Sequence, residues 1–225
     1  MRFLYHPEAG ADVLKLEGEG YRHLFKARRH RIGEEIVLRN LQEDYLYGYE
    51  AAAIGRKEAE LLLRWRRLEP VLPPHPFHLG WCVVDPKTVE KSLPALNELG
   101  VGRLSLVYCD RSQKNFRLDF ERMRRILINS CQQCGRSRLM ELERFDSLKE
   151  YLNAYPEGGV LDFGGDPLER GKLPQPILIG CEGGFSEAER DLFARQKVAV
   201  GRFVTPLVLR SETAATAVAA WAMEG

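Results

Sequence analysis

The chain has 225 residues, of which 44% are hydrophobic and 29% charged, and its formal net charge is +1. This composition is typical of a soluble globular protein, and the length suits a small domain joined to a larger one. The sequence holds no apolar run of membrane-spanning length, and it begins like a strand rather than a signal peptide. We therefore expect a cytoplasmic protein.

The N-terminal third reads as a succession of short strands. Strand-like alternation occurs at residues 2–6, 34–41, 45–53 and 60–68, and residues 42–44 have the character of a hairpin turn. Closely spaced strands of this kind predict a small β-barrel of about 70 residues.

Positive charge is concentrated near the N-terminus, although the whole chain is almost neutral. The segment 21–31 is rich in arginine, lysine and histidine and contains no acidic residue. Such a cluster suits binding to a phosphate backbone, because each neutralised phosphate releases counterions. An ordinary solvated surface is an equally good interpretation. Our candidate RNA-binding residues in this segment are Arg22, His23, Lys26, Arg28 and Arg29.

A proline-rich segment separates the strands from a different pattern. Residues 69–76 contain four prolines, which favours an extended linker, and we place a domain boundary between residues 70 and 71. A buried-type strand follows at 77–84. A helix with proline at its first position then runs from Pro86 to a glycine stop at Gly100.

The remainder of the chain alternates strands with helices. A helix is predicted over 118–134, with one apolar face and a second, basic stripe. This alternation indicates an α/β domain with a mainly parallel sheet. The further strands are expected at residues 101–109, 139–145, 160–163, 177–180 and 198–200.

The five cysteines do not suggest a disulfide framework, because their number is odd and they are scattered through predicted strands and helices. Cys131 and Cys134 have Cys-x-x-Cys spacing, but no second ligand pair or thioredoxin-like setting accompanies them. We interpret both as small packing residues on one helix and predict no metal site.

A glycine turn follows the predicted strand at 177–180. Gly183 and Gly184 permit positive φ and close approach of a ligand, and Ser186 with Glu189 has the spacing of a capping box that opens a helix. Strand, glycine turn and helix form a pattern typical of a ligand cradle. Alone, the stretch is also compatible with an ordinary strand-to-helix connection.

A second loop of this kind runs from 204 to 209 and leads into an alanine-rich helix. Glycines at 164–165, 180–184 and 201 all follow predicted strands, and ligands bind parallel sheets at the carboxyl ends of their strands. We expect the three strand ends to form one pocket. Because Gly-x-Gly-x-x-Gly and P-loop motifs are absent from the sequence, a dinucleotide or nucleoside triphosphate site has no support.

The two loops together carry a specific resemblance. Ile-Gly-Cys-Glu-Gly-Gly-Phe-Ser at 179–186, followed by Leu-Arg-Ser-Glu-Thr-Ala at 209–214, resembles the RsmE-type family of SPOUT enzymes, which methylate N3 of a uridine in 16S ribosomal RNA. The segments at 111–114 and 131–138 resemble further motifs of this family. Cys181 and Met140 stand where the family often has proline, and both lie beside motif positions.

The resemblance implies a fold, a cofactor and a substrate. The expected fold is a SPOUT-type knotted α/β methyltransferase domain at 71–225, with a C-terminal trefoil knot, preceded by a PUA-like RNA-binding β-barrel at 1–70. The cofactor is S-adenosyl-L-methionine, and the substrate is 16S rRNA, in the small ribosomal subunit. The cofactor-binding residues that it implies are Leu161, Phe163, Gly180, Glu182, Gly183, Gly201, Leu207, Leu209, Arg210 and Thr213.

The reaction requires a group that accepts the N3 proton or stabilises the resulting anion, because N3 is protonated at neutral pH. Glu182 is our candidate acceptor, with an alternative role as an anchor for the turn. Arg111 and Arg136 are candidates to stabilise the anion, with phosphate contact as the alternative. Further candidate RNA contacts are Lys114, Arg122, Arg125 and Arg138.

The terminal helix predicts self-association. Its alanines make it thin, and with Trp221 it carries more apolar surface than a chain-end helix needs in water. We expect a homodimer, as is typical of SPOUT enzymes. Two other functions remain open: a SPOUT ribose 2'-O-methyltransferase acting on tRNA or rRNA, and a non-catalytic RNA-binding protein.

Overall fold

The computed structural model describes residues 2–113 and 115–224 and divides into two compact units. The first unit comprises Met1–Leu72 and Ile128–Leu139, and the second comprises Pro73–Leu127 and Met140–Gly225. The division after Leu72 falls in the proline-rich linker. The return of Ile128–Leu139 to the first unit was not foreseen, because this segment includes the second half of one continuous helix.

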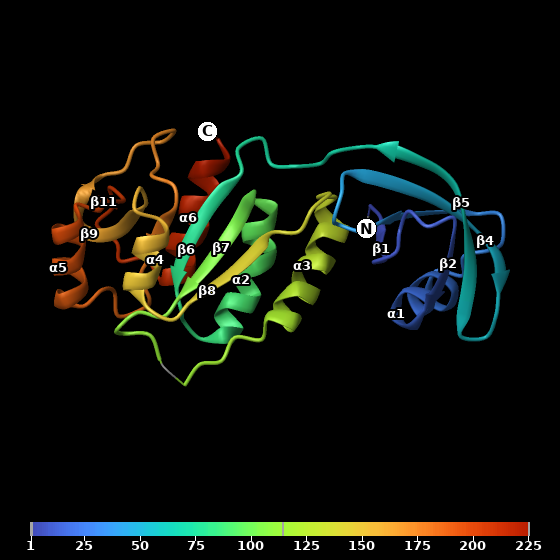
Figure 1. The fold of residues 1–225 in the computed structure, drawn as a ribbon, viewed down its shortest axis with the longest axis horizontal. Helices are drawn as coiled ribbons and strands as arrows, with labels where there is room; N and C mark the ends of the chain where they lie inside the picture. The colour runs from blue at the N-terminus through green and yellow to red at the C-terminus, as the bar shows by residue number, and fades with distance from the viewer. Residues whose placement is uncertain (1, 114, 225) are drawn as a thin grey trace. The chain divides into compact units, whose positions relative to one another are not determined.

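The first unit is built on a mixed five-stranded sheet with strand order β1-β3-β4-β5-β2 (Figure 1). β3 and β4 pair antiparallel across the predicted turn, and β1 pairs parallel with β3. The four predicted strands are confirmed. β2 was missed because it is short and buries only two side chains, Leu14 and Leu16. The strands are β1 Leu4–Tyr5, β2 Val13–Glu17, β3 Glu35–Arg39, β4 Tyr45–Ile54 and β5 Glu58–Leu68.

Two short helical segments lie beside this sheet, α1 at Gly18–Tyr21 and the π-helix η1 at Arg22–Ala27. Tyr21, Leu24 and Phe25 point into the core of the first unit, and Tyr21 is only 2% exposed. Burial of these apolar side chains holds the segment in place. The intervening basic side chains are therefore left on its outer side.

The second unit contains a six-stranded sheet in which every pairing is parallel, with strand order β11-β9-β10-β6-β7-β8. The predicted α/β domain with a parallel sheet is confirmed. Its strands are β6 Phe77–Cys82, β7 Val101–Val107, β8 Glu141–Phe145, β9 Gly159–Pro167, β10 Ile177–Ile179 and β11 Ala199–Arg202.

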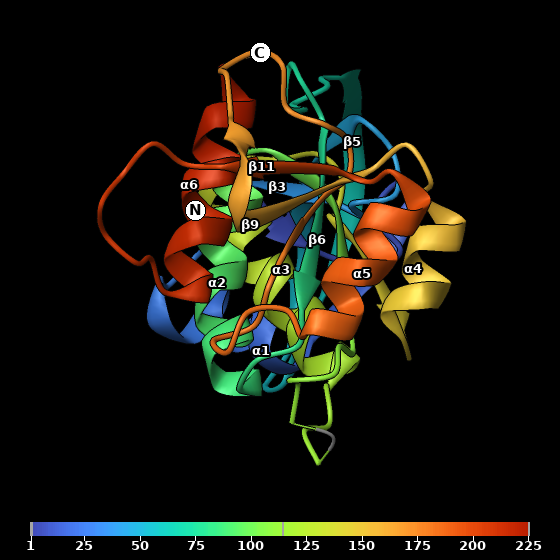
Figure 2. The ribbon, with the colours of Figure 1, turned by 90° about the vertical axis from the view of Figure 1, so that its left-hand side faces the viewer.

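Helices cover both faces of this sheet. Figure 2 shows α2 and α6 on one face and α4 and α5 on the other. The predicted glycine stop of α2 is confirmed, because Gly100 has φ +91°, a conformation that favours glycine. No helix of the described chain is long and apolar enough to cross a membrane. The helices are α2 Pro86–Glu98, α3 Phe120–Cys134, α4 Leu148–Ala154, α5 Glu187–Gln196 and α6 Ser211–Met223.

The structure joins Cys82, at the end of β6, to Cys109, just beyond β7, in a disulfide. We expected no disulfide framework, and this pair was not foreseen. Their Cα atoms lie 6.0 Å apart, within the range of such bonds. The sequence did not reveal the pairing, because the parallel strands bring together positions that are 27 residues apart.

A polar network is built on the α4 side of the sheet. His78 Nε2 lies 2.7 Å from Ser105 Oγ, and Ser105 donates to Glu143 at 3.0 Å. Tyr155 also donates to Glu143, and Arg103 pairs with the same carboxylate at 3.2 Å. Burial lowers the pKa of His78 from 6.5 to about 4, although the nearby Glu143 acts in the opposite direction.

This shift predicts a loss of stability in mild acid. Between pH 6.5 and about 4 the unfolded chain binds a proton at His78 that the folded chain does not, so the free energy of unfolding falls as the pH falls through this window. Allowing for solvent screening of a half-buried ring, we expect a loss of about 1 to 2 kcal/mol. Urea unfolding at several pH values measures it. His78→Gln should remove this component, whereas His75→Gln, at an exposed histidine, should not.

Candidate functional site

A cavity of about 460 Å³ lies beyond the carboxyl end of β10, beside residues 161–163 of β9. Three segments line it: residues 161–163 within β9, the glycine loop after β10, and the loop between β11 and α6 with the first turn of that helix. Of the three strand ends that we expected to form one pocket, only the glycine loop at 180–184 lines the cavity with its glycines, because Gly164, Gly165 and Gly201 lie outside the lining. The volume lies within the range of about 300–1000 Å³ common for small-molecule sites.

The glycine loop turns sharply after β10. Gly184 N–H donates to the Cys181 carbonyl at 2.9 Å, and Gly184 has φ +65°. Gly183 does not have positive φ, so our conformational reason for glycine there is wrong. Instead, a Cβ atom at Gly183 would lie 3.2 Å from Cδ of Arg111, whose guanidinium donates to the Gly183 carbonyl. The absence of a side chain at Gly183 therefore leaves room for the Arg111 side chain.

The helix that follows this loop is fixed by the predicted capping box. Ser186 Oγ accepts from Glu189 N–H at 3.1 Å, and Glu189 accepts from Ser186 N–H at 2.8 Å. Both residues also hold the segment after β7: Ser186 donates to the Asp110 carboxylate at 2.6 Å, and Glu189 accepts from Asp110 N–H at 2.9 Å. The capping box therefore fixes Asp110, and with it the neighbouring Arg111, against the start of α5 beside the cavity.

Ser211 links the third segment to the centre of the sheet. Its hydroxyl accepts a hydrogen bond from Trp81 Nε1 at 2.7 Å and donates to the Gly180 carbonyl at 2.5 Å. The start of α6 is thereby fixed against the end of β10. In the β9 segment, the Asp162 side chain is 7% exposed and pairs with Arg190 at 2.7 Å, which orients this segment.

Eight of the ten predicted cofactor-binding residues line the cavity and two do not. Gly201 lies outside it, and a Cβ atom there would overlap Leu168, so this glycine permits close packing. Thr213 is exposed on the first turn of α6 and is also outside the lining. The eight in the lining are Leu161, Phe163, Gly180, Glu182, Gly183, Leu207, Leu209 and Arg210.

Sequence reasoning missed several lining residues. Asp162 stands between two predicted residues but is not itself among them, and Ser211 belongs to the 209–214 motif without a predicted role. Neither the Asp162–Arg190 pair nor the Ser211 bridge has a local sequence signal, because their partners are 28 and 31 residues away. Cys181, Gly184, Thr205 and Val208 also line the cavity and lie in the two loops that we expected to form it, whereas the lining residues outside those loops that were missed are Ile179, Phe185, Arg190, Arg202, Phe203 and Ala214.

The three candidate catalytic residues occupy different environments. Glu182 is exposed and lines the cavity. Arg111 contacts the glycine loop through its guanidinium. Arg136 belongs to the first unit, where it is 6% exposed and burial lowers its pKa. The structure thus brings Glu182 and Arg111 to one loop and places Arg136 in the interior of the other unit.

The candidate RNA-binding residues are mostly exposed. In the first unit, Arg22, Lys26, Arg28 and Arg29 are exposed on or beside η1, whereas His23 is half-buried. Arg138 is exposed and pairs with Asp44 at 2.6 Å.

In the second unit, Arg122 and Arg125 are exposed on α3, and Arg122 pairs with Glu90 at 2.8 Å. Lys114 lies outside the described residues. The cluster beside η1 is therefore the largest group of exposed basic side chains among these candidates.

Comparison with known proteins places this architecture in a family. A family model described as an RNA methyltransferase domain matches residues 72–223. The chain is 48% identical over 223 residues to the "Ribosomal RNA small subunit methyltransferase E" of Helicobacter pylori (strain ATCC 700392 / 26695), with 97% of this chain and 98% of the relative covered. A more distant relative with the same name, from Buchnera aphidicola subsp. Schizaphis graminum, is 24% identical, with 92% of this chain and 88% of the relative covered.

Solved structures show the same fold over nearly the whole chain. The Neisseria gonorrhoeae ribosomal RNA small subunit methyltransferase E, bound to S-adenosyl methionine, has a TM-score of 0.82 at 20% identity and covers 98% of this chain and 95% of its own. A putative methyltransferase from Legionella pneumophila, in complex with the same cofactor, has a TM-score of 0.79 at 23% identity, with 99% and 95% covered. The matched RNA methyltransferase domain and the full-length relatedness together establish that this chain belongs to the family of ribosomal RNA small subunit methyltransferase E.

Proposed function

We propose that this protein transfers a methyl group from S-adenosyl-L-methionine to N3 of a uridine in 16S rRNA of the small ribosomal subunit, in the cytoplasm. The observation that carries the proposal is the cavity formed by the glycine loop and the loop before α6, in a chain related over its full length to named rRNA methyltransferases. The choice of N3 rests on the resemblance of residues 179–186 and 209–214 to the RsmE-type motifs.

The cavity has the size and lining that the cofactor requires. Leu161, Leu207 and Leu209 supply an apolar slot for a ring, and the glycine loop supplies backbone polar groups close to a ligand. Glu182 is exposed at the cavity and suits a cationic ligand. When bound, the cofactor supplies an electrophilic methyl group carried by a sulfonium.

The chain's own residues then position the uracil and manage its N3 proton. Glu182 accepts that proton, because it is the exposed carboxylate of the glycine loop. Arg111, held on the Gly183 carbonyl, stabilises the anion that forms. Arg136 is buried in the first unit, so we assign it a packing role. Alignment of the two reactants lowers the activation free energy, by about 7 to 11 kcal/mol in favourable cases.

Gly183→Val is expected to weaken cofactor binding by at least about tenfold without unfolding the protein. A valine would displace the Arg111 side chain, and its β-branched side chain would fill part of the cavity. Calorimetry with S-adenosyl-L-methionine measures the affinity, and a thermal melt checks the fold. Gly164→Val is the matched control, because open space surrounds a Cβ atom at Gly164. An unchanged affinity in folded Gly183→Val would reject the pocket assignment.

We also propose that the first unit is a PUA-like RNA-binding domain. The exposed basic residues on and beside η1 support this role. For the second unit we infer a SPOUT-type trefoil knot at the C-terminus, on the resemblance of residues 179–186 and 209–214 to the RsmE-type motifs.

Neutralising Arg22, Arg28 and Arg29 together with glutamine should weaken binding to 16S rRNA and flatten its salt dependence. Each lost phosphate contact lowers the slope of log K against log salt by about 0.7 to 0.9. Filter binding at several salt concentrations measures this slope, and cofactor affinity should not change. The control replaces Arg56, Lys57 and Arg64, which are also basic and exposed in the first unit. A wild-type slope in the first variant would assign the cluster to solvated surface.

We propose that the active form is a homodimer. Four apolar side chains near the cavity are strongly exposed, which is unusual for a surface that faces water. Closed two-fold pairing is the commonest way to cover such a patch. The four are Phe163 at 66%, Val204 at 73%, Leu207 at 69% and Val208 at 79%.

One experiment tests the function directly. The purified protein is incubated with radiolabelled S-adenosyl-L-methionine and small ribosomal subunits that lack the modification, and the rRNA is digested to nucleosides. We expect N3-methyluridine as the labelled product. A 2'-O-methyl nucleoside would instead favour the ribose methyltransferase alternative. Absence of saturable cofactor binding would favour a non-catalytic RNA-binding protein.

A further inference from the structure

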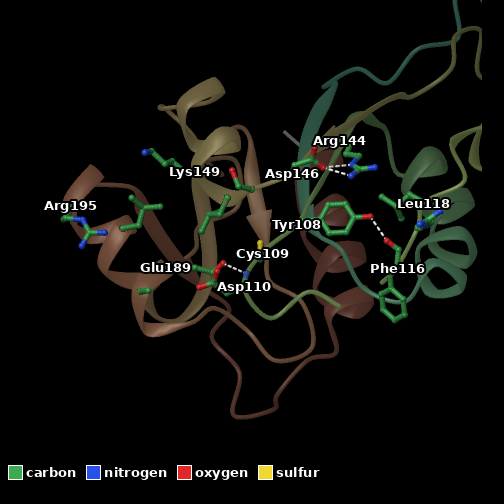
Figure 3. Close-up of a pocket in the computed structure, with 15 residues that line it drawn as sticks. Tyr108, Cys109, Asp110, Phe116, Leu118, Arg144, Asp146, Lys149, Glu189 and Arg195 are labelled. Atoms are coloured by element: carbon green, nitrogen blue, oxygen red, sulfur yellow. Dashed lines mark hydrogen bonds and ion pairs between the residues drawn. The ribbon is translucent and has the colours of Figure 1, made fainter. Parts of the chain in front are cut away.

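A second cavity, of about 1190 Å³, opens at the carboxyl edge of the same sheet (Figure 3). It is lined by residues that follow β7 and β8, including Tyr108, Asp110 and Asp146, and by α5 through Leu192. The proposed transfer reaction does not use these groups for chemistry. Its volume exceeds the range of about 300–1000 Å³ common for small-molecule sites, so it suits a segment of polymer.

The side chains that this cavity offers to a ligand are mainly cationic. Arg117, Lys149 and Arg195 are exposed at its wall, and no acidic side chain of the described residues lies within ion-pair distance of them. Arg144 lies over the Tyr108 ring, 4.9 Å from its centroid, and both residues line the same cavity as these three cations. Guanidinium planes and aromatic rings are surfaces on which unpaired bases stack.

The acidic groups in the lining are engaged within the protein. Asp146 pairs with Arg144 at 2.6 Å. Glu189 accepts from Asp110 N–H and Ser186 N–H, and Asp110 accepts from the Ser186 hydroxyl (Figure 3 shows the Glu189–Asp110 bond). These carboxylates are fixed by local bonds, so the three unpaired cations dominate the charge that a ligand meets.

The second cavity adjoins the proposed cofactor cavity through a short stretch of chain. Asp110 and Glu189 line the second cavity, and the neighbouring Arg111 reaches the Gly183 carbonyl, which belongs to the first. Ser186, which caps α5 directly after the glycine loop, is bonded to Asp110. A strand of RNA with its target base at the first cavity can thus continue into the second.

We propose that this second cavity holds a single-stranded segment of substrate RNA that flanks the target nucleotide. Arg117, Lys149 and Arg195 contact its phosphates, and the Arg144–Tyr108 stack supports one of its bases. This inference rests on the proposed function and adds to it a binding site distinct from the methyl-transfer site.

Two variants test it in the full-length protein. Lys149→Gln with Arg195→Gln is expected to raise KM for small ribosomal subunits about tenfold and to lower the salt slope of RNA binding by about 1.4, as for two single-strand phosphate contacts. The matched charge control is Lys87→Gln with Lys91→Gln, at two exposed lysines on α2. Its KM and salt slope should stay near wild type.

The second variant blocks the cavity without changing charge. Ala188→Trp places an indole in the lining, whereas Ala194→Trp places one at an exposed position of the same helix outside it. We expect Ala188→Trp to raise KM while cofactor affinity and thermal stability stay unchanged, and Ala194→Trp to behave as wild type. Wild-type KM for both the Ala188→Trp and the double-glutamine variants, in an enzyme that is otherwise active, would overturn the inference. An inactive wild-type enzyme would instead reject the proposed function.

Discussion

Glu182→Gln is expected to lower kcat by about 10² to 10⁴ while S-adenosyl-L-methionine still binds. Transfer of a proton to a positioned side chain contributes an acceleration of this order, and an amide does not replace a carboxylate as proton acceptor. Glutamine keeps the size of the side chain, so the glycine loop should retain its conformation. Single-turnover methylation of small ribosomal subunits, with calorimetry for the cofactor, measures both quantities.

The structure argues against a turn-anchor role for Glu182. The turn closes through the Gly184 N–H bond to the Cys181 carbonyl, and the Glu182 side chain is exposed. Raising the pH should partly restore the rate of Glu182→Gln, because uridine N3 then ionises without a base. A turnover rate equal to wild type at neutral pH would remove Glu182 from the mechanism. Glu187→Gln, an exposed neighbour on α5 outside the cavity, is the control.

Local sequence signals predicted the elements well where each element carries its own pattern. Gly100, which ends α2, and the Ser186–Glu189 capping box are short-range features, and both are present. The parallel sheet followed from the alternation of strands and helices. Short elements that bury few side chains, such as β2 and η1, gave too little periodicity to be recognised.

The features that escaped prediction depend on contacts between distant parts of the chain. Cys82 and Cys109 meet because β6 and β7 are neighbours, and Ser211 meets Gly180 because α6 begins against the end of β10. Gly201 was assigned to the site because it follows a strand, whereas its contact with Leu168 gives it a packing role. Sequence position at a strand end indicates the edge of the sheet, but not which side chains face the cavity.

The terminal helix illustrates the same limit for assembly. Trp221 was expected at a dimer interface. Its ring instead packs against Phe203 of the same chain, with the ring centroids 5.0 Å apart, and the Arg170 guanidinium lies 5.2 Å from the Trp221 ring centroid. Trp221→Glu would therefore disturb the protomer itself. The exposed apolar surface lies instead at Val204 and its neighbours, so the interface is best tested there.

Val204→Glu is expected to give monomers at micromolar concentration and to lower methyl transfer by at least about 100-fold. Val204 is 73% exposed and lies outside the cavity lining, so a glutamate there is solvated in the monomer. In a dimer it would place an unpaired charge in an apolar contact, which costs several kcal/mol. Light scattering beside the activity assay measures both effects. Leu72→Glu, at a residue that is 47% exposed in the linker, is the control and should remain dimeric and active. A monomeric Val204→Glu variant with full activity would show that methyl transfer does not need a second subunit. A wild-type protein that is monomeric at micromolar concentration would reject the dimer itself.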